Sequence, residues 1–472
     1  MDILFKAVTL INEYLSDYVL IILLLGAGLY FTVRTRFVQI RAFGEGWKNT
    51  FGKISFRKQK GNSFNSFQAL ATAVAAQVGT GNIVGASGAI LTGGPGAIFW
   101  MWITAFLGMS TIYAEAVLAQ KTRIIDEEGA PHGGPVYYIK HAFPNLFGKI
   151  LAGVFAVAII VALGFMGVMV QANSIGETCQ KAFGVPAWIV GGVVAIGAGA
   201  VFIGGVGRLA RVTEKLVPFM AIFYLTGGIA VLILRWEYLP ETFGCIFKYA
   251  FSPEALIGGG FGHALKTAVS QGVKRGLFSN EAGMGSTPHA HAIAQVKSPH
   301  IQGTVAMIGV FIDTAIVLTM TALIVISTIY TGDGPLANAT GSTYGELLKN
   351  AGLTQTNLVQ YAISTVTGSA FGNIFVAVCL FFFAFSTIIS WNYFGRINCH
   401  YLFGKKAVMI YSLLAILFIF IGSMAKSDLV WGLQDMFNQV MVLPNMIALL
   451  ALSNLVVSSA GGEKKEAPEK GK

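Results

Sequence analysis

Charged residues are scarce in this chain of 472 residues: they make up 11% of it, whereas hydrophobic residues make up 54%. A soluble globular chain carries about 25% charged residues, so this composition excludes an ordinary soluble protein and indicates one that crosses a membrane many times. The net charge of +10 then fits basic loops on one side of a bilayer. Nucleic-acid binding would need a basic face on a soluble domain, and the sequence offers none.

Cysteine and catalytic motifs are equally sparse. The four cysteines (Cys179, Cys245, Cys379 and Cys399) have no metal-binding spacing. A disulfide between Cys179 and Cys245 is conceivable, but spacing alone does not decide it. The chain has no Walker phosphate loop, no GxSxG and no HExxH, so we expect neither an enzyme nor a cofactor. The N-terminus has no basic segment with a small-residue cleavage site, which predicts no removable signal peptide.

Long apolar stretches are what the sequence has in abundance. A helix needs about 20 apolar residues to cross a bilayer, and on that length we predict an all-α polytopic membrane protein with about eleven spans. The predicted spans are Tyr18–Val33, Phe67–Leu91, Ala97–Leu118, Ile150–Ser174, Trp188–Val206, Leu216–Leu234, His263–Ala292, Val305–Tyr330, Asn373–Phe394, Val408–Met424 and Leu429–Leu452.

The charges of the loops predict how these spans are oriented. Residues Arg34 to Gly61 hold eight Lys and Arg against the single acid Glu45, which predicts a cytoplasmic loop. The N-terminus is then expected outside and the C-terminus in the cytoplasm. Arg235–Gly262 and Thr331–Gln360, which carry few cations, are expected to be external. Lys274 and Arg275 are expected to be solvated in an outer vestibule.

Setting the first span aside leaves ten, which divide into two halves of five. An odd number of spans makes the two halves insert with opposite orientation, as an inverted repeat requires. We therefore predict an N-terminal helix with its basic segment (residues 1–61), a first repeat (62–236), a second repeat (237–455) and a disordered cytoplasmic tail (456–472).

The first of these ten spans carries a break that a lipid-facing helix would avoid. Gly79 and Gly81 surround Thr80, and Asn82 and Gln77 add side-chain amides. Glycine costs about 1 kcal/mol relative to alanine in a helix interior, and irregular backbone at membrane depth occurs where it lines a cavity. Glycine-rich packing of two helices is the alternative reading. We favour a binding site, because a simple packing face would leave the side-chain amides of Gln77 and Asn82 without hydrogen-bond partners.

The sixth span of the ten is broken in the same way. The residues crowded at this second break are Phe278, Ser279, Asn280, Glu281, Gly283 and Met284. Paired interrupted helices point to the substrate site of a secondary transporter. A free amide end suits a carboxylate and a free carbonyl end suits an ammonium group, so an amino acid matches the pair. Glu281 either supports the site or couples transport to an ion. A third interpretation is that it forms an ion pair with Lys274 or Arg275.

Other polar residues inside the spans complete the candidate site. Gln171 interrupts an apolar run, and Trp391 is a candidate pocket wall. Ser386 and Thr387, together with carbonyls near Ala76 and Gly79, would supply the oxygen ligands that a sodium ion prefers. The alternative, with equal weight, is that both hydroxyls donate hydrogen bonds to carbonyl groups one turn earlier in their own helix. Asp313 is the rival ion-coupling residue, and Glu115 reads as structural.

Four motifs give the chain a resemblance to a known family. The segments GTGNIVG (Gly79–Gly85), GGPGAIFWMW (Gly93–Trp102), VQANSI (Val170–Ile175) and SNEAGMGS (Ser279–Ser286) resemble the alanine or glycine:cation symporter family, and the likeness runs from Tyr18 to about Leu452. It implies a five-plus-five inverted-repeat core of the LeuT type and sodium-driven uptake of alanine or glycine in a bacterium or archaeon. It also implies a site at the Thr80–Asn82 break, Gln171, the Phe278–Gly283 break and the helix face near Trp391.

The expected function is therefore import of alanine or glycine coupled to sodium, across the inner membrane of a prokaryote, by alternating access. Its partners would be the amino acid, sodium and the lipid bilayer, with no obligate protein partner. A proton-coupled carrier that uses Glu281 or Asp313 is the first alternative. A channel is the alternative from a different class.

Overall fold

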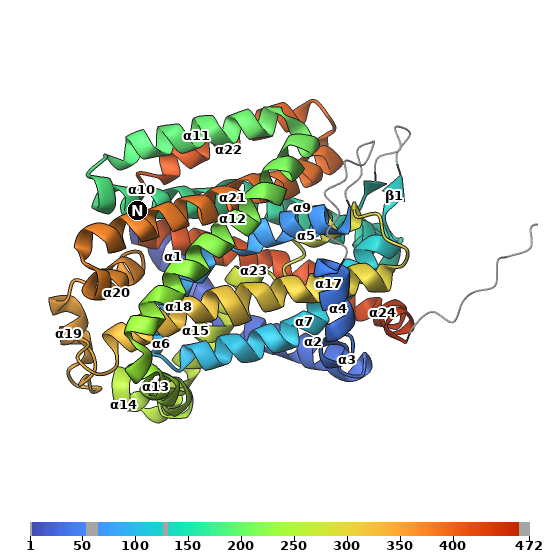
Figure 1. The fold of residues 1–472 in the computed structure, drawn as a ribbon. Coiled ribbons are helices and arrows are strands. Elements are labelled where there is room, and N and C mark those ends of the chain that lie inside the picture. The colour runs from blue at the N-terminus through green and yellow to red at the C-terminus, as the bar shows by residue number, and fades with distance from the viewer. Residues whose placement is uncertain (1, 53–64, 126–130, 462–472) are drawn as a thin grey trace, which may run out of the picture.

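A computed structural model describes residues 2–52, 65–125 and 131–461. Nearly all of this is helical (Figure 1). The exception among the regular elements is a small antiparallel pair, β1 (Ile124–Ile125) with β2 (Pro131–His132). The prediction of an all-α membrane protein is confirmed in all but this hairpin.

The N-terminal part is one long helix with a π-helical turn in it. It consists of α1 (Asp2–Tyr14), η1 (Leu15–Leu20) and α2 (Ile21–Arg34). The membrane-spanning candidate here covers Lys6–Arg34, so the first span is longer at its N-terminal end than the prediction from Tyr18. Two short helices follow, α3 (Val38–Arg41) and α4 (Phe43–Phe51); the basic residues Lys53, Arg57, Lys58 and Lys60 fall outside the described residues.

The first predicted repeat is built from helices, and two π-helical segments, η2 and η3, interrupt their regular α-helical geometry. Its elements are α5 (Ser66–Gln77), η2 (Gly81–Gly85), α6 (Ala86–Gly93), α7 (Ala97–Lys121), α8 (Pro135–Ala142), α9 (Leu146–Ile159), η3 (Ile160–Gly167), α10 (Val168–Phe183), α11 (Ala187–Ile203) and α12 (Gly205–Leu234). The cations Arg208, Arg211 and Lys215 fall between the predicted spans Trp188–Val206 and Leu216–Leu234, where a loop is expected, but they lie on the first turns of α12.

The second predicted repeat follows after a turn. Its elements are η4 (Trp236–Tyr238), α13 (Leu239–Phe251), α14 (Glu254–Ile257), α15 (Phe261–Asn280), α16 (Pro288–Ala292), α17 (Pro299–Val310), η5 (Phe311–Leu318), α18 (Thr319–Ile329), α19 (Tyr344–Asn350), α20 (Leu358–Thr367), α21 (Ser369–Phe403), α22 (Ala407–Gly422), α23 (Ser427–Ala451) and α24 (Ser453–Ala460). Residues 456–460 are thus helical, which corrects the predicted start of a disordered tail at 456.

Each predicted span has a helical counterpart, although the total of eleven stays a prediction. Within the described chain, six helical stretches are long and apolar enough to cross a bilayer, and up to eight if each of two bent pairs counts as one span. Two shorter apolar helices, α11 and α22, and the more polar α15 account for the remainder. All four cysteines are free, so Cys179 and Cys245 form no disulfide.

The short helices gather at the two ends of the long ones. In Figure 1, α13, α14, α19 and α20 gather at one end of the long helices, and α3, α4, β1 and α24 gather at the other. The first group comes from the segments predicted to be external, except that most of α20 follows Gln360, and the second from those predicted to be cytoplasmic. α11 and α22 pack together along one edge, whereas α5, α15, α21 and α23 pass close to the interior.

Candidate functional site

The first break lies where the sequence predicts it. α5 ends at Gln77, Val78 leaves the helical region with ψ of 89°, and α6 continues at an angle of 45°. The backbone groups that the break frees find partners in polar side chains. The amide of Gly79 donates to Oδ1 of Asn82 at 3.0 Å, and the amide of Thr80 donates to Oε1 of Gln171 at 3.2 Å.

Glycine is required at this break by close packing as well as by backbone freedom. A Cβ at Gly79 would lie 2.3 Å from Oγ1 of Thr387, and one at Gly81 would lie 2.8 Å from the Cα of Ser279. These are separations that two non-bonded atoms cannot adopt. The glycines therefore let α21 and the second break pack closely against the first one, as the packing interpretation of these glycines predicts.

The second break is a tight turn with left-handed backbone. α15 ends at Asn280, and Glu281, Gly283 and Gly285 have φ of 58°, 96° and 79°. Nε2 of Gln77 donates to the carbonyl of Asn280 at 2.8 Å, which ties the two breaks together. The amide group of Asn280 bridges the turn to η5 by accepting from the amide of Ala282 and donating to Oγ1 of Thr314.

The carboxylate of Asp313 lies between the two breaks. It accepts hydrogen bonds from Nδ2 of Asn82 at 2.6 Å, from Oγ of Ser279 at 2.9 and 3.1 Å, and from Oγ1 of Thr314 at 2.8 Å. Asp313 is fully buried, and no cationic side chain among the described residues forms an ion pair with it. A buried carboxylate without a counter-charge is costly, so a cation bound here would be stabilised.

Three of the four predicted sodium ligands, Ala76, Ser386 and Thr387, lie together with the carbonyl of Ala75, whereas the carbonyl of Gly79 accepts from the amide of Asn82. Oγ1 of Thr387 lies 3.0 Å from the carbonyl oxygen of Ala75 and 3.3 Å from that of Ala76, and Oγ of Ser386 lies 3.2 Å from that of Ala75. Both hydroxyls also bond back to the carbonyl of Phe383. Hydroxyl and carbonyl oxygens are the donors that hard cations prefer. The oxygens of Ser386, Thr387, Ala75 and Ala76 are of the kind that sodium prefers, and Ala75 is the member that the sequence did not single out.

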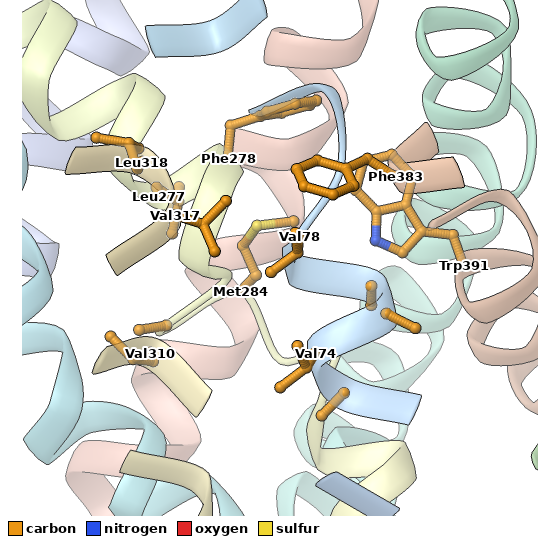
Figure 2. Close-up of a cluster of buried hydrophobic side chains, with 14 of the residues drawn as sticks. Val74, Val78, Leu277, Phe278, Met284, Val310, Val317, Leu318, Phe383 and Trp391 are labelled. Carbon is orange, nitrogen blue, oxygen red and sulfur yellow. The ribbon is translucent and has the colours of Figure 1, made fainter. Parts of the chain in front are cut away.

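Apolar side chains line one side of the region between the two breaks. The rings of Phe278 and Trp391 meet edge to face with centroids 5.7 Å apart, and Met284 is fully buried beside them. Figure 2 shows these side chains with Val78, which belongs to the first break. Nε1 of Trp391 donates to Oε1 of Glu281 at 2.5 Å, so Glu281 holds the indole in place and does not pair with Lys274 or Arg275.

Several polar atoms at the breaks have no hydrogen-bond partner within the described part of the chain. They are Oε1 of Gln77, Oγ1 of Thr80 and Nε2 of Gln171. Buried polar groups in native proteins are almost always hydrogen-bonded. An amide oxygen, a hydroxyl and an amide N–H around the first break are therefore left for a further polar partner.

Gly283 faces a different partner from the other predicted site residues. Its amide donates to Oε2 of Glu115 at 3.1 Å, and the amide of Gly285 donates to Oε1 at 2.9 Å. Nδ2 of Asn445 adds a third bond to Glu115 at 2.6 Å. Successive amides of a left-handed turn form a concave site for an anion, and here α7 supplies that anion itself. The sequence indicated a structural role for Glu115 but not this partner.

The predicted solvation of Arg275 is wrong. Arg275 is only 7% exposed and its Nη1 pairs with Oδ1 of Asp435 at 3.1 Å, while Nζ of Lys274 pairs with Oδ2 at 3.1 Å. The guanidinium group also stacks over the ring of Trp431 at 4.6 Å. The sequence missed Asp435 and Trp431; the signal was an acid inside an apolar predicted span, which is a functional candidate by default.

Comparison with known proteins places this site in a family. A model of the sodium:alanine symporter family matches residues 1–468. The chain belongs to this family. It is 41% identical over 453 residues to the sodium/alanine symporter AgcS of Methanococcus maripaludis, which covers 96% of this chain and 95% of that one. Membership makes it a transporter of the cation-coupled amino-acid symporter class.

Other members of the family carry different names. The chain is 38% identical to the putative sodium/proton-dependent alanine carrier protein YrbD of Bacillus subtilis, with 94% and 89% of the two chains covered. It is 35% identical to the probable sodium/glutamine symporter GlnT of the same organism, with 97% and 90% covered. The named substrates thus differ within the family.

A solved structure confirms the fold. MhsT in complex with L-phenylalanine matches with a TM-score of 0.60 over 85% of this chain and 96% of that chain, at 14% identity. MhsT is a transporter of the LeuT fold. The predicted LeuT-type core with two discontinuous helices is therefore confirmed for this family member.

Proposed function

We propose that the protein imports alanine or glycine together with sodium by alternating access around the two breaks. The observation that carries this proposal is the set of unpaired polar atoms on Gln77, Thr80 and Gln171. They surround a break where backbone amides and carbonyls converge, and a small zwitterion would satisfy both kinds of group. The protein would move its substrate without changing it covalently and would need no cofactor.

In this proposal the amino acid lies with its carboxylate toward the amide end of the broken first helix. The start of η2 at Gly81 carries the partial positive charge of a helix N-terminus, and Nε2 of Gln171 is the unpaired donor beside it. The ammonium group would meet the unpaired acceptors of Gln77 and Thr80 and the carbonyls of the second break. Ser279, Asn280, Gly283 and Met284 would shape the turn that faces it.

Phe278 and Trp391 would limit the size of the substrate side chain. Their rings pack edge to face, so an isobutyl or benzyl group would have to displace one of them. The name of AgcS, sodium/alanine symporter, favours a small substrate. The name of GlnT, which refers to glutamine, makes side-chain size a property that varies among relatives.

Sodium would bind where α21 approaches the end of α5. Thr387 and Ser386 would contribute hydroxyl oxygens, and Ala76 and Gly79 carbonyl oxygens, with Ala75 as a further ligand suggested by its contacts with both hydroxyls. The ion would then bridge α5, which ends at the first break, and α21, which carries Trp391. That position would couple ion binding to the arrangement of the break.

We also propose the topology that the loop charges predict. The protein would lie in the inner membrane of a prokaryote, with the N-terminus outside and the C-terminus in the cytoplasm. Residues 62–236 and 237–455 would form the two inverted repeats, after the N-terminal segment 1–61 and before a cytoplasmic tail. No obligate protein partner is required by this scheme.

The test is uptake of radiolabelled alanine by proteoliposomes under three imposed gradients: inward sodium, inward potassium and inward protons. Accumulation above the external concentration only with the sodium gradient is the expected result. Equal entry under all conditions without accumulation would contradict coupled transport and favour a channel.

One observation favours a second candidate function, proton-coupled uptake. The buried carboxylate of Asp313 has three neutral donors and no cation paired with it in the described structure. A proton could serve as its counter-charge. In that case the proton gradient alone would drive accumulation, and Asp313→Asn would abolish it. Under the sodium proposal the proton gradient alone would drive no accumulation.

A further inference from the structure

Two short helices that precede the two breaks share a sequence motif. The segment FGEGWKNTF (Phe43–Phe51) of α4 and the segment FGCIFKYAF (residues 243–251) of α13 align without a gap and are identical at four of nine positions. A fifth position is aromatic in both, as Trp47 and Phe247. The motif thus recurs ahead of each broken helix, and its first copy lies before residue 62, where we propose that the first repeat starts.

The two helices also pack in corresponding ways on the opposite repeat. α4 packs on α17, and α13 packs on α7, so each contacts the second span of the other predicted repeat. Both contacts are close: a Cβ at Gly46 would lie 2.7 Å from the carbonyl oxygen of Thr304, and one at Gly96, the residue before α7, would lie 2.1 Å from that of Tyr249. Figure 1 shows α4 and α13 at opposite ends of the long helices. An inverted repeat produces this kind of reciprocal placement.

Each of the two helices presents three faces, because residues four apart lie on the same side of a helix. The buried face holds Gly46 and Thr50 in α4, and Thr242, Ile246 and Ala250 in α13. Beside it runs an aromatic stripe with the same spacing in both helices: Phe43, Trp47 and Phe51, and Phe243, Phe247 and Phe251. Phe43 is half-buried, and the other five rings are 38% to 54% exposed. The third face is polar and exposed, with Glu45 and Lys48 in α4 and Glu241 and Lys248 in α13.

The aromatic stripes continue into a groove on the side of the membrane-spanning helices. The ring centroids of Phe43 and Trp47 lie 5.0 and 6.5 Å from that of Phe311, and the centroid of Phe247 lies 6.3 Å from that of Trp102. Phe311 and Trp102 line one apolar groove of about 290 Å³ between α7 and η5. Phe106 also lines it and is 39% exposed on α7, which is long and apolar enough to span a bilayer. Both stripes therefore extend a surface that faces acyl chains.

We propose that α4 and α13 are interfacial helices, one at each surface of the bilayer, whose aromatic stripes lie between the lipid head groups and the acyl chains. Aromatic rings are enriched at that depth, and helices with one apolar and one charged face lie in the plane of the interface. Lys48 and Lys248 would extend their ammonium groups toward lipid phosphates. With the proposed topology, α4 lies at the cytoplasmic surface and α13 at the external one.

A protein partner does not account for both helices. Contiguous exposed apolar patches mark contacts with a membrane or with another protein. A soluble protein could cover only the stripe on its own side of the membrane, whereas the same motif is presented at both ends of the long helices (Figure 1). The bilayer offers the same boundary between head groups and acyl chains on both sides. Its two surfaces therefore match the repeated stripe.

The test measures the depth of nitroxide spin labels on the full-length protein in proteoliposomes. A background in which the four native cysteines are replaced by alanine takes one new cysteine at a time: Trp47→Cys, Phe51→Cys, Phe247→Cys or Phe251→Cys. Lys48→Cys and Lys248→Cys, on the polar faces of the same helices, are the matched controls. Oxygen concentrates in the bilayer and a nickel chelate in water. We therefore expect the ratio of oxygen to chelate collisions to be at least about three-fold higher for the stripe labels than for the controls.

Two outcomes of the depth measurement would overturn the proposal. Stripe labels as accessible to the chelate as the controls would show that the stripes face water. Stripe labels that neither reagent reaches would show that a second copy or another protein covers them. Two stripe positions in each helix allow for a variant that does not elute as monodisperse protein.

A second measurement tests the two membrane surfaces. A membrane-impermeant thiol reagent applied to intact cells should modify Lys248→Cys but not Lys48→Cys. Modification of both from the outside would overturn the placement of the helices at opposite surfaces. Neither readout requires transport, so failure of the proposed function would not change the result of either one.

Discussion

Nδ2 of Asn82 donates to Oδ1 of Asp313 at 2.6 Å. Asn82 belongs to the first broken segment and Asp313 to η5, so this bond joins the two predicted repeats at the point where both are irregular. The same amide group accepts from the backbone of Gly79 through its Oδ1. Asn82 therefore supports the break and positions the buried carboxylate with a single side chain.

Asn82→Ala should abolish alanine uptake without loss of protein. The change leaves the amide of Gly79 unpaired and removes a donor from Asp313, and an unsatisfied buried group costs about 1–3 kcal/mol. We expect at least a ten-fold fall in the initial rate of uptake by proteoliposomes, at equal amounts of reconstituted protein. Uptake at the wild-type rate would refute the role of Asn82.

Trp391→Ala should widen the range of substrates. The indole packs on Phe278, so its removal opens space for larger amino-acid side chains. The measurement is inhibition of alanine uptake by valine, leucine and phenylalanine, each expected to inhibit at least ten-fold more strongly than in the wild type. Trp391→Phe is the control, because it keeps most of the volume but loses the bond to Glu281; an unchanged profile in Trp391→Ala would contradict a size filter.

Thr387→Val should weaken the dependence on sodium selectively. Valine has nearly the same shape but no oxygen, so the ion would lose a ligand while the packing against Gly79 is kept. We expect the sodium concentration for half-maximal uptake to rise at least ten-fold, with a small change in alanine affinity at saturating sodium. Thr387→Ser keeps the hydroxyl and should resemble the wild type; equal effects of the two substitutions would argue against ligation.

Glu115→Gln should destabilise the protein. The carboxylate accepts from the amides of Gly283 and Gly285 and from Asn445, and a glutamine amide would turn a donor toward one of these donors. The expected loss is about 1–3 kcal/mol, seen as a lower melting temperature in detergent by tryptophan fluorescence. Glu237→Gln, at an exposed acid, is the control and should melt like the wild type.

The sequence predicts those parts of the site whose residues are unusual in a membrane-spanning helix. Glycines and amides such as Gly79 and Asn82 do not belong in a lipid-facing helix, so their presence indicates a break whatever they contact. The long motifs then identify the fold, because they cover both breaks. The break at Gln77, the turn after Asn280 and the approach of Thr387 to α5 all follow from such local signals.

The parts that the sequence does not predict depend on partners far apart in the chain. Arg275 and Asp435 are 160 residues apart, and nothing local to either shows that they meet. Glu115 likewise binds a turn that begins more than 160 residues later. Helix boundaries also differ from prediction where cations lie on helical turns, as Arg208 does on α12, because charge alone does not end a helix.

The central claim is that sodium enters with the amino acid. The most direct test is uptake of radiolabelled sodium by proteoliposomes with no gradient of pH or sodium, started by adding external alanine. The account predicts that alanine stimulates sodium entry in a fixed ratio to alanine entry, and that Thr387→Val reduces both together. Alanine entry without any accompanying sodium would contradict it.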